Sequence, residues 1–143
     1  MTVITIKDGV LACDSGATAY GVHVGTVSKA RRLGDGSVVA VSGHMEQASH
    51  LLSQMEQDGR AEIAGDEVCA AWLMPDGGIR VLDGPCPEWA EIEAPFFALG
   101  SGSALAYGAM AAGASAERAV EIACDMATDC RGPVRTFKAG ERP

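Results

Sequence analysis

The amino-acid sequence predicts an α+β domain, and three observations lead to this prediction. Short β-branched or apolar runs lie between glycine-containing turns, an amphipathic helical stretch follows the first group of strands, and two alanine-rich helical stretches precede the last strand. Antiparallel strands on both sides of the helical stretches are typical of a layered α+β domain. A chain of 143 residues has room for one core, so residues 1–143 are expected to form a single domain with a frayed tail at 139–143.

The first two strands are predicted at Val3–Ile6 and at Val10–Cys13, where the residues are β-branched or apolar. Asp8-Gly9 lies between them, and an Asp-Gly pair is a strong signal for a tight hairpin. A hairpin centred on this pair brings Thr2 beside Asp14. The residues alone also fit an ordinary N-terminal hairpin with a solvated carboxylate.

Periodicity and turn residues predict the elements that follow. A helix over Met45–Gln57 has one apolar face and ends at Gly59, and Ser115 is placed to cap a later helix whose apolar face includes Val120. Short apolar runs between turns predict the strands. The expected strands are Val38–Val41, Val68–Met74, Ile79–Asp83, Phe96–Leu99 and Val134–Lys138, with an edge strand at Trp89–Glu93 and a further helix at Gly102–Ala112.

The charge and hydropathy pattern excludes several classes of function. The net charge of −8 argues against a nucleic-acid partner, because phosphate binding needs a basic patch. No apolar run approaches the roughly 20 residues that a membrane-spanning helix needs, and the first residues lack the pattern of a signal peptide. We therefore expect a cytoplasmic protein with no membrane partner.

The cysteines and histidines do not indicate a metal site, and no cofactor is expected. The cysteines are odd in number and form no CxxC pair, so they are interpreted as reduced, mostly buried small hydrophobes. His44 and His50 are six positions apart and do not share a helical face as i, i+4 zinc ligands do. The five cysteines are Cys13, Cys69, Cys86, Cys124 and Cys130.

Thr2 could act as a catalytic nucleophile if Met1 is removed, because one residue then carries both a hydroxyl nucleophile and a free α-amine that serves as its base. The pKa of an α-amine is ordinarily about 7.7–8.0, so part of it is unprotonated near neutral pH. Threonine is small enough for methionine removal to be expected. Many proteins begin Met-Thr, so the meaning of this start depends on the motifs that follow.

Short motifs along the chain resemble, in order, those of the proteasome β-subunit and HslV-type peptidases, which are N-terminal nucleophile hydrolases. Each motif is short, but together they cover nearly the whole chain. The motifs are Thr2, Asp14-Ser15, Lys29-Ala30-Arg31-Arg32-Leu33, Val38-Val39-Ala40-Val41-Ser42-Gly43, Phe96-Phe97-Ala98-Leu99-Gly100-Ser101-Gly102-Ser103 and Ala127-Thr128-Asp129-Cys130. The resemblance implies a compact version of the four-layer αββα sandwich.

The resemblance implies that Thr2 is the nucleophile and that its own amine acts as base through a water molecule. Lys29 would lower the pKa of this amine and the cost of charge on the hydroxyl oxygen, and Asp14 would hold Lys29 in an ion pair. The plainer alternative is that Lys29 is one more exposed cation beside Arg31 and Arg32.

Three further residues complete the implied site. Gly43 would donate its backbone N–H to the oxyanion, and Ser101 and Asp129 would hydrogen-bond near the amine and set its protonation. Their plainer alternatives are a strand-to-helix turn, a helix cap and a helix-end carboxylate. An acidic side chain at a helix C-terminus is unfavourable to the helix dipole, which indicates that Asp129 has another partner.

The implied function is a threonine-type peptidase that cleaves peptides or unfolded proteins within a self-compartmentalised homo-oligomeric ring. An ATP-dependent unfoldase is a candidate partner. In HslV-type members a second long helix helps to form the docking surface for the unfoldase, and the stretch from Gly59 to Val68 is too short for such a helix. Two alternatives stay open: a catalytically inactive structural or assembly subunit of the same fold, and an amidase that acts on small amides.

Overall fold

A computed structural model describes residues 2–59, 68–83, 88–127 and 129–141. Two larger antiparallel sheets and three helices make up most of this part of the chain. In spatial order, the first sheet contains β10 (Phe96–Leu99), β1 (Ile4–Lys7), β2 (Val10–Cys13) and β11 (Arg135–Lys138). The second sheet contains, in spatial order, β5 (Ala30–Arg32), β6 (Val38–Gly43), β7 (Val68–Leu73), β8 (Ile79–Asp83) and β9 (Ala90–Ile92). The helices are α1 (Met45–Asp58), α2 (Ser103–Ala111) and α3 (Ala116–Met126), and a separate hairpin pairs β3 (Gly16–Ala19) with β4 (Val22–Thr26).

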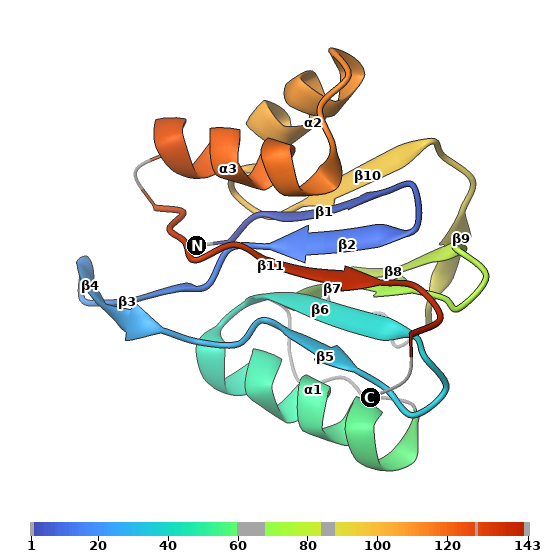
Figure 1. Cartoon of the computed structure of the whole chain (residues 1–143). Coiled ribbons are helices and arrows are strands. Elements are labelled where there is room, and N and C mark those ends of the chain that lie inside the picture. Colours follow the sequence, from blue (N-terminus) through green and yellow to red (C-terminus); the bar gives the residue numbers. More distant parts are fainter. Residues whose placement is uncertain (1, 60–67, 84–87, 128, 142–143) are drawn as a thin grey trace.

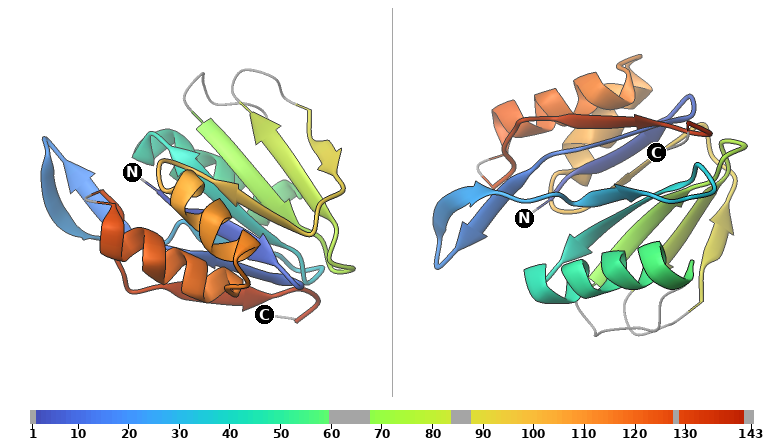
Figure 2. Two further views of the ribbon diagram at one scale, coloured as in Figure 1. Left: turned by 90° about the horizontal axis from the view of Figure 1, so that it is seen from above. Right: turned by 60° about the horizontal axis from the view of Figure 1, so that its bottom comes forward.

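The two larger sheets face each other, with helices on their outer faces (Figure 1). Helices α2 and α3 cover the first sheet, and α1 covers the second, as the turned views also show (Figure 2). Three clusters of buried apolar residues lie between these layers, one under α2 and α3, one between the sheets and one under α1. Both faces of the inner strands are covered, so β2, β6 and β7 are apolar almost throughout rather than alternating, whereas the edge strands β9 and β11 carry exposed residues.

The first hairpin forms as the sequence predicts. Asp8 and Gly9 both adopt positive φ angles, 53° and 73°, which is the geometry of a two-residue hairpin turn whose twist matches that of the strands. The register pairs Ile4 with Cys13 and Lys7 with Val10. Partners β10 and β11 then flank the two strands, so this hairpin forms the centre of its sheet.

The predicted helices are confirmed with their end signals. Gly59 ends α1 in a left-handed conformation, with φ of 67°, and donates its N–H to the Met55 carbonyl at 3.0 Å. Ser115 caps α3 by accepting a hydrogen bond from the Arg118 N–H at 3.1 Å. The α3 face that packs on the first sheet is mostly alanine, including the buried Ala123, which lets the helix lie close to the strands.

The prediction of a mixed fold with antiparallel strands is confirmed, and the β3–β4 hairpin is an element that the sequence does not predict. This hairpin projects from one end of the molecule (Figure 1). No helix in the described residues is long and apolar enough to cross a membrane.

The predicted burial of the cysteines is correct for Cys13 and Cys130, whereas Cys69 and Cys124 are half-buried. Cys86 and the interior of the stretch between Gly59 and Val68 lie outside the described residues. In the tail, Ala139 donates its N–H to the Gly9 carbonyl at 2.8 Å.

Candidate active site

The open end of the first hairpin places Thr2 next to a buried carboxylate. The Asp14 N–H donates to the Val3 carbonyl at 3.2 Å, which continues the strand pairing beyond β1 and β2. In return, the Val3 N–H donates to Asp14 Oδ1 at 3.0 Å. Asp14 has no exposed surface, and Thr2 is also buried. The hairpin thus fixes the carboxylate one residue from the predicted nucleophile.

Lys29 supplies the charge that this carboxylate needs. Its Nζ lies 3.1 Å from Oδ1 and 3.0 Å from Oδ2 of Asp14, and its side chain is 8% exposed. The Arg131 N–H adds a hydrogen bond to Oδ2 at 3.3 Å, and the Lys29 carbonyl accepts from the Val41 N–H at 2.9 Å. A buried charge is tolerated only when it is paired and hydrogen-bonded, so these contacts explain why the ion pair can lie inside the molecule.

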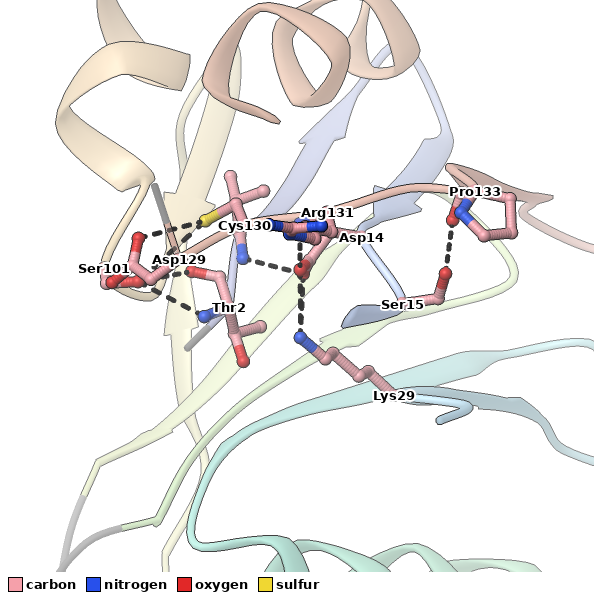
Figure 3. Close-up of polar contacts among 10 residues, drawn as sticks. Thr2, Asp14, Ser15, Lys29, Ser101, Asp129, Cys130, Arg131 and Pro133 are labelled. Atoms are coloured by element: carbon pink, nitrogen blue, oxygen red, sulfur yellow. Dashed lines mark hydrogen bonds and ion pairs between the residues drawn. The ribbon is translucent and has the colours of Figure 1, made fainter. Parts of the chain in front are cut away.

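The neighbouring cations do not share this environment. Arg31 is 35% exposed and forms an ion pair with Glu56 at 3.6 Å on the outside of the molecule. The alternative in which Lys29 belongs to one exposed basic cluster is therefore wrong, because its ammonium is directed inward to Asp14 (Figure 3).

The Gly100–Gly102 turn holds the backbone of Thr2. The Thr2 nitrogen donates to Ser101 Oγ at 3.2 Å (Figure 3). The Thr2 carbonyl accepts from the Gly102 N–H at 3.2 Å. Gly100 has a φ of 98°, and a Cβ atom there would clash with the Thr2 carbonyl oxygen. Glycine is thus required at this position for Thr2 to approach so closely. Ser101 is not the N-cap of α2, since that position is taken by Gly102.

A cavity of about 500 Å³ opens on this network. Thr2, Lys29 and Gly43 line it, and β3, the adjoining turn at Tyr20 and the first turns of α1 form its walls. Gly43 ends β6 with a φ of 134°, a conformation that disfavours any other residue. The predicted nucleophile, cation and oxyanion donor are therefore brought to one concave site.

Asp129 is connected to this site through a residue that the sequence analysis did not assign. It follows the C-cap of α3 at Ala127, and its Oδ1 lies 3.8 Å from the thiol of Cys130. Cys130 Sγ in turn lies 4.0 Å from Ser101 Oγ. Within the part of the chain that the structure describes, no direct hydrogen bond joins Asp129 to Thr2.

Three groups have site roles that the sequence alone does not predict: the thiol of Cys130, the backbone N–H of Arg131 and the glycine at Gly100. The Gly100-Ser101-Gly102 run is a detectable turn signal, but the other two contacts join residues far apart in the chain. Burial and the nearby negative charge of Asp14 raise the pKa of the Cys130 thiol. The group is thus a neutral thiol at neutral pH and has a proton to donate.

Comparison with known proteins shows the fold. No known family model and no curated protein sequence matches the chain. Among solved structures, BPH of Thiobacillus denitrificans in complex with epoxomicin is 21% identical, with a TM-score of 0.71 over 99% of this chain and 100% of that chain. HslV from Trypanosoma brucei is 18% identical, with a TM-score of 0.69 over 96% of this chain and 98% of that chain. The chain therefore has the fold of BPH and HslV, so the resemblance inferred from the motifs is confirmed at the level of fold.

Proposed function

We propose that this protein is a threonine-type peptidase in which Thr2, after removal of Met1, is the N-terminal nucleophile. The observation that carries the proposal is the buried Lys29–Asp14 ion pair at the open end of the first hairpin, on the same cavity as Thr2. A protein gains little stability from burying such a pair, so its retention next to a residue with nucleophilic potential favours a chemical role.

The reaction begins with proton transfer from the Thr2 hydroxyl to the Thr2 amine through a water molecule. The positive charge of Lys29 disfavours a second cation nearby, so the amine is more often neutral and able to accept the proton. The hydroxyl oxygen bonds to the carbonyl carbon of the substrate, and the C–N bond breaks as the leaving amine takes the proton back. Water then hydrolyses the ester on Thr2, with the same amine as base.

Gly43 and Ser101 have supporting roles in this mechanism. Gly43 lines the cavity, and its backbone N–H stabilises the oxyanion that forms on the substrate carbonyl. Ser101 Oγ orients the Thr2 nitrogen, with which it already shares a hydrogen bond of 3.2 Å. Asp129 acts on the nitrogen indirectly, because its contact within the described residues is with Cys130.

We interpret the order of helices and sheets as a compact αββα sandwich in one domain. The likeness to HslV-type peptidases supports assembly into a homo-oligomeric ring that admits peptides or unfolded chains, in the cytoplasm. The inactive structural subunit remains the alternative, and it corresponds to a chain that keeps Met1, because the Thr2 nitrogen is then an amide and cannot act as base.

The test combines intact-mass measurement with hydrolysis of a fluorogenic peptide library. Loss of Met1, a mass increase after incubation with epoxomicin and peptide hydrolysis are expected for the wild-type chain. Thr2→Ala is expected to reduce hydrolysis to the uncatalysed background, whereas Thr2→Ser retains a hydroxyl and keeps measurable activity.

Thr18→Ala is the matched control, because Thr18 is another threonine that lines the same cavity. We expect it to hydrolyse peptides at close to the wild-type rate. A wild-type chain that keeps Met1 and hydrolyses nothing would favour the structural subunit. Equal hydrolysis by Thr2→Ala and the wild type would remove Thr2 from the mechanism.

A further inference from the structure

Cys130 occupies a position that packing alone does not explain. Its side chain is 1% exposed and lies in the apolar cluster between the first sheet and helices α2 and α3. The sulfur nevertheless faces two polar groups, Ser101 Oγ at 4.0 Å and Asp129 Oδ1 at 3.8 Å. Room for it comes from Gly102, where a Cβ atom would lie 3.1 Å from the sulfur.

The polar groups around the thiol form a continuous series of contacts that reaches Thr2. An ionised carboxylate only accepts hydrogen bonds, so the single thiol proton of Cys130 points to Asp129. The Ser101 hydroxyl proton has two acceptors within reach, the Thr2 carbonyl oxygen at 3.3 Å and the Cys130 sulfur at 4.0 Å, and the Ser101 oxygen accepts from the Thr2 N–H at 3.2 Å. These contacts run from Thr2 through Ser101 and Cys130 to Asp129 (Figure 3). Sulfur makes weak hydrogen bonds, but a buried chain of them fixes the orientation of each member.

We infer that Cys130 is a positioning residue, which connects the charge of Asp129 to Ser101 and so fixes the hydroxyl that binds the Thr2 nitrogen. This inference rests on the proposed function, since the nitrogen matters for catalysis only if it is the base. The negative charge of Asp129 at one end of these contacts polarises them, so that Ser101 Oγ at the other end is a better acceptor for a protonated Thr2 amine. It therefore raises the basicity of the Thr2 amine, while the positive charge of Lys29 keeps part of the amine neutral and able to accept the proton.

The competing interpretation is that Cys130 only fills space. The two interpretations predict opposite rankings of two substitutions. In Cys130→Val the new side chain is apolar and similar in size, so it preserves packing but removes the contacts with Ser101 and Asp129. Cys130→Ser preserves a donor and an acceptor but leaves a small gap and places a hydroxyl in an apolar cluster.

The experiment titrates the Thr2 amine by NMR, in a chain prepared with isotope-labelled Thr2 as its first residue by cleavage of an N-terminal fusion. We expect Cys130→Val to lower the pKa of the amine by about half a unit to one unit, the range that one neutral hydrogen bond carries. Cys130→Ser is expected to keep the wild-type value. Cys124→Val, a change at a second thiol of the same cluster, is the matched control and is expected to change nothing.

A double-mutant cycle tests whether Asp129 acts on the Thr2 amine through Cys130. Asp129→Asn is expected to lower the pKa of the amine by a similar amount, and adding Cys130→Val to it is expected to have little further effect. In peptide hydrolysis, Cys130→Val is expected to reduce kcat by roughly three- to tenfold with little change in KM, and Cys130→Ser is expected to restore most of it.

The inference is overturned if Cys130→Val leaves the amine titration unchanged, or if Cys130→Ser is the more damaging change at the amine. Because the titration requires no turnover, this failure is separate from that of the proposed function. The proposed function fails if the wild type and Thr2→Ala hydrolyse peptides equally, whatever the titration shows.

Discussion

The two hairpins at the start of the chain have similar turns and opposite surroundings. Asp8-Gly9 and Tyr20-Gly21 both place two consecutive residues at positive φ, between 53° and 76°. The β1–β2 hairpin is flanked by strands on both sides and covered by helices, and it carries Asp14 at its open end. The β3–β4 hairpin forms a two-stranded sheet of its own, and Tyr20 at its tip is fully exposed.

The same local turn thus serves two structural roles, one in the core and one at the wall of the cavity. The first hairpin needs rigidity, because it must hold a buried ion pair against the backbone of Val3, next to Thr2. The second contributes β3 and its turn to the wall of the cavity, and it contacts less of the core. An isolated two-stranded hairpin is marginally stable in water, so the second hairpin is expected to open locally long before the domain unfolds.

The largest effect is expected from breaking the ion pair beside the first hairpin. Lys29→Ala leaves the Asp14 carboxylate buried without its cation, which costs about 3–5 kcal/mol of unfolding free energy. Peptide hydrolysis should fall to background, because the amine loses the positive charge beside it. Denaturant unfolding and the fluorogenic assay measure the two effects.

Arg31→Ala is the control for this change, because its ion pair with Glu56 is largely solvated. It is expected to cost about 0–1 kcal/mol. A Lys29→Ala protein that is as stable and active as Arg31→Ala would contradict the role assigned to the buried pair.

The next effect compares the two turns directly. A Cβ atom meets nothing within 4 Å at either Gly9 or Gly21, so alanine adds only the strain of positive φ. Gly9→Ala is expected to lower the global free energy of unfolding by about 1 kcal/mol, because β1 and β2 unfold with the core. Gly21→Ala is expected to reduce hydrogen-exchange protection in β4 and to change global stability by less than about 0.5 kcal/mol.

Equal losses of global stability from both glycine substitutions would show that the second hairpin unfolds together with the first. Hydrogen exchange followed by mass spectrometry resolves the two hairpins as separate peptides, so the comparison is made within one protein.

A smaller effect is expected at alkaline pH from the buried strand β2. Burial, together with the charge of Asp14, raises the pKa of the Cys13 thiol from 9.0 to about 12. The folded chain therefore retains a proton that the unfolded chain loses, and stability should fall as the pH rises from about 9 toward 12. Cys13→Ala should be less stable at neutral pH because of lost packing, but should show a shallower decline over this range. An equally steep decline would contradict the contribution of this thiol.

The smallest effect is expected at the tip of the second hairpin. Tyr20→Ser removes a ring that makes no buried contact, so the unfolding free energy should change by less than about 0.5 kcal/mol. Thermal denaturation measures this. A loss above about 1 kcal/mol would mean that the ring contributes to folding.

The sequence predicts those elements whose signals are local. The Asp8-Gly9 turn, the amphipathic α1 ending at Gly59 and the Ser115 cap depend on neighbouring residues, and all of them form. The β3–β4 hairpin escaped prediction because Tyr20-Gly21 lacks an Asn or Asp and because Gly16–Ala19 has no large apolar residues to alternate. Its structure depends on its place in the fold rather than on a strong turn signal.

The candidate site was predictable only in part. The first hairpin alone indicated that Thr2 lies beside Asp14, but the pairing of Asp14 with Lys29 required the resemblance, since nothing local distinguishes Lys29 from its basic neighbours. The contact between Ser101 and Cys130 joins residues 29 positions apart and depends on how α3 returns to the sheet. Such contacts come from tertiary packing and have no periodicity to reveal them.

The most direct test of the central claim compares two preparations that differ only in Met1. One begins with Thr2 and the other retains a blocked methionine, and both are mixed with the same peptide substrate and followed by intact mass and product release. We predict an acyl-enzyme and peptide hydrolysis only when the Thr2 amine is free. Equal hydrolysis by the two preparations would contradict a mechanism in which that amine is the base.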